Sequence, residues 1–190
     1  MKKVLVLALV AIALCFSACK EPHVTPLNPL AKALFAPGGN DSKWDYTDLR
    51  ATNPDDRVFS VVVSDYDEYE NECEEKKVSS EAISYKLGGT PCNVYSNSCV
   101  EDNTAYIKVA IPHTDPLVLR CDANGNFDCK AYEYLETYDL LGITYNKVHH
   151  FTVELASAEV DYWFAENIGL VYAQDNQGKV CLKLTGHTIY

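Results

Sequence analysis

Apolar and polar residues alternate through most of the chain after about residue 43, a pattern typical of β-strands with one buried face. The clearest runs have apolar faces at Phe59, Val61 and Val63, at Ala105, Ile107, Val109 and Ile111, and at Val180, Leu182 and Leu184. No window after residue 43 has the apolar spacing of a long, capped helix. A mainly β fold with few or no long helices is therefore expected.

Turn residues separate these runs. Gly88-Gly89, Asn124-Gly125 and Asp175-Asn176-Gln177-Gly178 are hairpin signals, because these residues accept the backbone angles that tight turns require. Short strands joined by hairpins favour an antiparallel sheet that curls into a barrel, a half-barrel or a sandwich.

The stretch before the alternating pattern is rich in turn-forming residues. It holds four prolines and Gly38-Gly39, with room for one helical turn over Leu30–Phe35. We therefore expect a flexible tether over residues 19–43 and a single β-rich domain over residues 44–190.

The first residues have the order of a bacterial secretory signal peptide. A basic start is followed by the uncharged apolar run Val4–Phe16, which is too short to span a bilayer as a stable helix. Small residues then precede Cys19. The order predicts a signal peptide over residues 1–18; the alternative is an ordinary secreted protein with a coincidental Cys19.

The sequence Phe16-Ser17-Ala18-Cys19 resembles the lipobox of bacterial lipoproteins, with Phe16 where that family usually has Leu. The resemblance implies cleavage before Cys19, acyl chains such as palmitate on its sulfur, and membrane attachment through that N-terminal lipid. It also implies a lipid-anchored protein of the bacterial cell envelope, at the outer membrane. Lys20-Glu21 resembles the start that directs some lipoproteins to the cell surface.

The chain is acidic, with 27 Asp and Glu against 16 Lys and Arg, for a formal charge of −11. Residues 1–18 include Lys2 and Lys3 and no acid, so the remaining chain carries −13. Such a surface repels nucleic acid and anionic lipid headgroups. We expect no nucleic-acid partner.

Six of the eight cysteines remain after Cys15 leaves with the signal peptide and Cys19 takes the lipid. An even number in an exported chain predicts disulfides. The absence of Cys-x-x-Cys and His-x-x-x-His pairs argues against the alternative, a metal site, and no cofactor is expected.

Local spacing narrows the possible pairings. Cys121 and Cys129 flank the Asn124-Gly125 turn, and Cys92 and Cys99 bracket a polar loop. The expected disulfides are Cys121–Cys129, Cys92–Cys99 and, by elimination, Cys73–Cys181.

The segments Glu136–Val148 and Tyr162–Val171, followed by a glycine turn and a closing strand, resemble the ending of a family of uncharacterised bacterial lipoproteins. That family carries a Tyr-x-Val strand and a Phe-Ala-x-x-Val/Ile-Gly-Leu-Val hairpin. The resemblance covers about residues 136–186. It implies an antiparallel, partly open β-barrel like that of lipoprotein carriers, and it implies no activity. With the cysteines, the expected fold is mainly β: an antiparallel curled sheet, partly open as a barrel and disulfide-stapled.

Two features carry candidate chemistry. Seven acids crowd Asp65–Glu75, but without the glycine spacing of a calcium loop we expect a solvated acidic loop. If Val148–Leu155 is a strand, His149 lies on its apolar face as a hydrogen-bonded core residue and His150 on the opposite face.

The aromatic run Tyr162-Trp163-Phe164 is expected to fill the core, and Gly169 to allow a close backbone approach. No catalytic sequence motif occurs, although a carboxylate pair assembled from distant strands stays open.

These observations favour a lipid-anchored, non-catalytic binding or structural display module over an enzyme. Its partner would be an envelope protein or a glycan, bound at Asp65–Glu75 and at the Cys92–Cys99 loop. The alternatives are a carrier of an apolar ligand in a half-open β-barrel and a hydrolase of envelope or extracellular polymers.

Overall fold

The computed structural model describes residues 24–53, 57–76, 78–96, 99, 104–112, 114–156, 158–178 and 180–190. The predicted signal peptide, the predicted lipidation residue Cys19, and two histidines, His23 and His113, lie outside these ranges. The described residues contain no helix with the length and apolar character needed to cross a bilayer.

The N-terminal half contributes one short helix and seven strands. These are β1 (Val24–Thr25), α2 (Pro29–Phe35), β2 (Lys43–Asp48), β3 (Val58–Cys73), β4 (Val78–Leu87), β5 (Thr90–Ser96), β6 (Ala105–Val109) and β7 (Leu117–Cys121). The C-terminal half adds five strands. These are β8 (Ala131–Leu140), β9 (Ile143–Glu154), β10 (Glu159–Ala165), β11 (Gly169–Asp175) and β12 (Cys181–Thr188).

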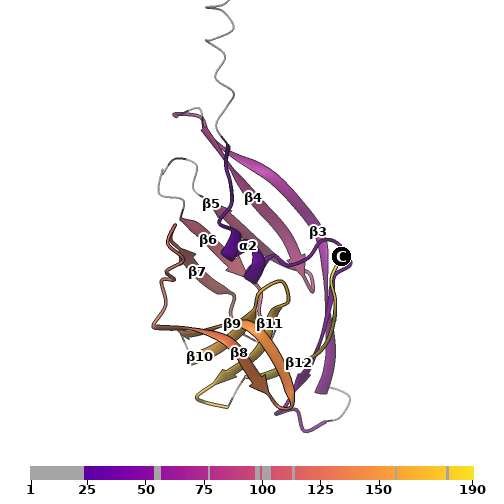
Figure 1. Cartoon of the computed structure of the whole chain (residues 1–190). Coiled ribbons are helices and arrows are strands. Elements are labelled where there is room, and N and C mark those ends of the chain that lie inside the picture. Colours follow the sequence, from indigo (N-terminus) through magenta and orange to yellow (C-terminus); the bar gives the residue numbers. More distant parts are fainter. Residues whose placement is uncertain are drawn as a thin grey trace, which may run out of the picture.

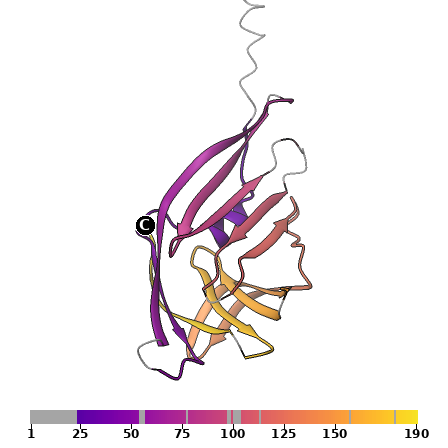
Figure 2. The ribbon, with the colours of Figure 1, turned by 180° about the vertical axis from the view of Figure 1, so that it is seen from behind.

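Eleven strands follow one another through a single sheet in the order β7-β6-β5-β4-β3-β2-β12-β11-β10-β9-β8, and β1 pairs separately with β4. Each half is an antiparallel meander, and the pairing of β12 with β2 joins the halves. The sheet edges β7 and β8 are therefore consecutive in sequence. Figures 1 and 2 show the sheet curling so that the two halves face each other. The prediction of a mainly β, antiparallel, curled and partly open barrel is confirmed.

The alternating residues bury the faces that the sequence predicts. Val63, Ile107 and Leu182 are at most 2 % exposed and point into the concave side of the sheet. In β10, Tyr162 and Phe164 are buried there, whereas Trp163 lies on the outer face. The aromatic run thus fills the core with two of its three residues.

Helix α2 lies inside the curved sheet, where Figures 1 and 2 show it enclosed between the two halves. It packs against β5, β6 and β11. Ala31 and Leu34 have no exposed surface, and the Phe35 ring lies 4.8 Å from that of Phe164. Gly169, at φ +91°, makes the expected close approach: a Cβ there would lie 3.3 Å from Pro37 Cγ.

The expected flexible tether over residues 19–43 is therefore wrong for its described part, residues 24–43. Val24 pairs with Ser79 of β4, and Leu27 is only 4 % exposed. The folded domain includes this segment because the concave sheet needs an apolar cover, which α2 supplies.

The cysteine pairing also differs from the prediction. Cys73, at the end of β3, is bonded to Cys99, so Cys92–Cys99 and Cys73–Cys181 are wrong. Within the described ranges the free thiols are those of Cys92, Cys121, Cys129 and Cys181. The expected hairpin turn does form, but Cys121 lies opposite Phe127 rather than Cys129. The register therefore does not place the expected pair face to face.

The acidic segment is a strand rather than the expected loop. Most of Asp65–Glu75 belongs to β3, where Asp67–Cys73 pairs with β4. The disulfide Cys73–Cys99 ties the end of this strand to the segment that follows β5.

Candidate functional site

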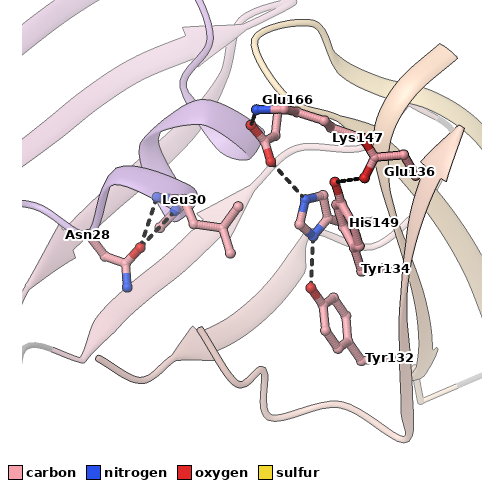
Figure 3. Close-up of polar contacts among 9 residues, drawn as sticks. Asn28, Leu30, Tyr132, Tyr134, Glu136, Lys147, His149 and Glu166 are labelled. Atoms are coloured by element: carbon pink, nitrogen blue, oxygen red, sulfur yellow. Dashed lines mark hydrogen bonds and ion pairs between the residues drawn. The ribbon is translucent and has the colours of Figure 1, made fainter. Parts of the chain in front are cut away.

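A connected polar group near the core surrounds His149 on β9 (Figure 3). The register places His149 between Tyr134 of β8 and Phe164 of β10. Its side chain is 3 % exposed, as expected for the apolar face of this strand, while that of His150 is 23 % exposed on the other face.

Both ring nitrogens of His149 have partners. Nδ1 lies 2.9 Å from the Tyr132 hydroxyl and Nε2 lies 3.4 Å from Glu166 Oε1. An ionised carboxylate can only accept, so the arrangement fits the tautomer with hydrogen on Nε2, whose Nδ1 accepts from the tyrosine. Edge strand β8, strand β9 and the β10–β11 turn are thereby linked through one imidazole.

Burial lowers the pKa of His149, because desolvation disfavours the charged ring. Its contact with Glu166 opposes this shift, and the nearby Lys147 adds to it. Lys147 also lies 3.3 Å from the Glu166 carboxylate. The imidazole is therefore held neutral at pH 7.

Helix α2 is fixed at both ends beside this group. Asn28 caps it through bonds from Leu30 N and Ala31 N to Oδ1, while its Nδ2 donates to Asp122 O at 3.1 Å. At the other end, Asn167 N donates to Ala33 O at 2.8 Å. Since Asn167 follows Glu166, the β10–β11 turn contacts both His149 and helix α2.

Three hollows stand out among the described residues. The interior one measures about 40 Å³ and is lined by apolar residues, among them Leu34, Trp44 and Phe164. A groove of about 380 Å³ beside α2 includes Glu68 and Glu70. A second groove, of about 400 Å³, lies on the outer face of β5, β6 and β7. None of the three is lined by Tyr132, His149 or Glu166.

The order carboxylate, imidazole, hydroxyl matches the order of a nucleophile relay. Burial raises the pKa of Tyr132, however, whereas an activated nucleophile needs a lowered pKa or an open site for a substrate. The polar atoms of Tyr132, His149 and Glu166 instead link β8, β9 and the turn that contacts the end of α2. The geometry supports a structural role for His149.

An aromatic cluster covers the outer face of the C-terminal half, a feature that the sequence did not reveal. The Trp163 ring stacks on His150 at 4.3 Å and 7°, and on Tyr138 at 6.0 Å and 11°. His150 Nε2 lies 3.1 Å from Asp161 Oδ1. The ring faces stack on one another, so the cluster is a packed layer and does not offer free ring faces for a ligand to stack on.

The cysteines predicted as site residues are spread over the fold. Cys92 is buried in β5, where its sulfur accepts from Ala110 N at 3.1 Å. Burial raises the pKa of Cys121 to about 12, and Cys181 lies 3.4 Å from the Tyr172 hydroxyl on the outer face. The described residues contain no group of three or more His, Cys, Asp or Glu side chains that could hold a metal ion.

Tyr132 and Glu166 were missed as partners of His149. Tyr132 lies two residues from Tyr134, which faces His149, but the choice between them depends on side-chain geometry. Glu166 lies in the turn of the hairpin that the sequence indicates after Phe164-Ala165, but no local pattern shows that its side chain reaches His149. No protein-family model, curated protein or solved structure is significantly similar to the chain, so its sites are interpreted from their geometry.

Proposed function

We propose that this protein is a lipid-anchored lipoprotein of the bacterial cell envelope whose domain is a non-catalytic binding or display module. The anchor is supported by the sequence around Cys19, which lies outside the described residues. The module is supported by one observation above all: the concave side of the sheet is filled by the protein's own side chains.

The apolar hollow beside α2 measures about 40 Å³, whereas small-molecule sites measure about 300–1,000 Å³. Helix α2 supplies much of the filling through Ala31, Leu34 and Phe35. Hydrogen bonds hold it there, since Tyr85 donates its hydroxyl to Phe35 O and Asn28 caps its start. A ligand carrier of the half-barrel type would need this volume empty, so binding is assigned to the outer surface.

Intact mass of three proteins expressed in a bacterial host, the wild type, Cys19→Ala and Cys15→Ala, tests both parts of the proposal. Under denaturing conditions the wild type should carry acyl mass and begin at Cys19. Cys19→Ala should carry none, and the control Cys15→Ala should stay acylated. Under native conditions, Cys19→Ala should have the mass of its polypeptide alone.

Two outcomes contradict the proposal separately. Acyl mass on Cys19→Ala would contradict the proposal that Cys19 carries the lipid anchor. A co-purified lipid on Cys19→Ala, released by denaturation, replaces the display module with the carrier.

A further inference from the structure

The outer face of β5, β6 and β7 presents side chains that the core does not use. Alternation buries Val94, Ile107 and Leu119, which are at most 2 % exposed, and turns their neighbours outward. Two cross-strand rows result from the register: Asn93, Lys108 and Val118, and Tyr95, Tyr106 and Arg120. These six residues border the groove of about 400 Å³, which we call the outer groove.

Two tyrosines form its aromatic part. The rings of Tyr95 and Tyr106 stack at 5.4 Å and 17°, and both side chains are half-buried. Stacking fixes the rings against each other, and each phenol hydroxyl can both donate and accept a hydrogen bond. The Asn93 amide adds a further donor and acceptor beside them.

Two cations, Lys108 and Arg120, and one acid, Asp128, border the groove in a chain whose formal charge is −11. Arg120 is held by Asp128, to which its Nε donates at 3.1 Å. Lys108 is exposed and has no acidic partner among the described residues. Its ammonium group is therefore available to an anion.

The local charge at Lys108 and the net charge of the whole molecule together limit how many negative charges the ligand can carry. Locally, Lys108 favours a carboxylate, but the acidic molecule as a whole repels a polyanion. A ligand with few charges, separated by neutral hydrogen-bonding groups, satisfies both. The volume of the groove lies within the range of small-ligand sites.

We propose that the outer groove binds an acidic oligosaccharide, with a sugar carboxylate at Lys108 and neutral sugar hydroxyls along Asn93, Tyr95 and Tyr106. The inference rests on the proposed display module and names its ligand class. The site lies on the three paired strands β5, β6 and β7 rather than on a loop, so the side chains are positioned before the ligand arrives.

Titration calorimetry with two matched glycan pairs tests the proposal on the full domain. The acidic probes are 3′-sialyllactose and trigalacturonic acid, and their neutral counterparts are lactose and α-1,4-galactotriose. At least one acidic glycan should bind at least tenfold more tightly than its counterpart. Lys108→Ala should weaken that binding at least fivefold, and Lys108→Arg should restore most of it.

Lys86→Ala is the matched control, because Lys86 is also a β-strand lysine but pairs with Asp65 outside the groove. It should leave binding unchanged. Thermal unfolding of each variant checks that the fold is intact.

The proposal is overturned if neither acidic glycan binds at 10 mM, if both bind no better than their neutral counterparts, or if Lys108→Ala binds like the wild type. Tighter binding of a triglutamate peptide than of either glycan would assign the groove to an acidic protein segment instead. These failures leave the intact-mass result untouched, so they are distinguishable from failure of the display module.

Discussion

His149 makes the stability of the protein depend on pH. Its pKa in the folded state is lowered by burial, while in the unfolded chain it returns to about 6.5. The folded state thus favours the neutral ring, and this contribution is complete above pH 6.5. As the pH falls below 6.5 the unfolded state takes up the proton first, so the contribution is lost toward the lower folded pKa.

The free energy of unfolding in urea should therefore fall more steeply between pH 7 and pH 5 in the wild type than in His149→Gln. The charged groups near the ring, Glu166 and Lys147, are retained in the variant, so the difference between the two profiles reports His149. His187→Gln, which changes an exposed histidine on β12, should keep the wild-type slope. Equal slopes for the wild type and His149→Gln would show that the ring does not titrate as described.

Tyr132 and Tyr134 offer a matched pair of hydroxyls on the same strand. Tyr132→Phe removes the donor to His149 Nδ1 and leaves a buried acceptor unpaired, which costs about 1–3 kcal/mol. Tyr134→Phe removes only a bond to the exposed Glu136 and should not change stability measurably. Urea unfolding at pH 7.5 measures both, and equal effects would contradict the structural role of His149.

Helix α2 is stabilised by its surroundings rather than by its own sequence, because a seven-residue helix is marginal in water. Leu34→Ala should lower the free energy of unfolding by about 2–5 kcal/mol, since it opens a cavity in the core. Lys32→Ala, on the same helix, breaks a half-exposed ion pair with Glu68 and should cost less than about 1 kcal/mol. A small effect at Leu34 would mean that the helix is not a structural part of the core.

The strands were predictable from alternation, and the helical turn expected over Leu30–Phe35 forms as α2, but its burial inside the sheet was not predictable. Each strand carries its own periodic signal, as Leu182 and Leu184 show. The start of α2 also has a local signal, because Asn28 is a favourable cap and Pro29 suits the first helical position. The neighbouring prolines led to the expectation of a flexible tether around this turn, and nothing local indicates that a concave sheet will bury the helix.

At the scale of the whole molecule, long-range pairing decided what the sequence left open. The curled antiparallel fold follows from short strands and tight turns, but the pairing of β2 with β12 joins segments about 140 residues apart. The same limit applies to the cysteines. Cys73 meets Cys99 because β3 and β5 flank β4. Cys121 lies opposite Phe127, because the register of its hairpin differs from the one expected for a Cys121–Cys129 pair.

Only part of the His149 group could be predicted from the sequence, because its partner Glu166 comes from the turn of another strand pair. The face of His149 follows from strand periodicity, but Glu166 reaches it only because β10 pairs with β9 and places its turn there. The proposed function also depends on long-range contacts, since the interior is filled when helix α2 packs between the two halves of the sheet.

Amide hydrogen exchange of α2 tests the central claim, that the helix permanently fills the interior. The amides of Lys32 and Ala36, which donate to Asn28 O and Lys32 O, should exchange as slowly as that of Phe151 on β9, which is fully buried. Both should then open only with global unfolding. Exchange of the helix amides many times faster than that of Phe151, and its slowing by added phospholipid, would show that α2 is a movable lid over a ligand cavity and would contradict the account.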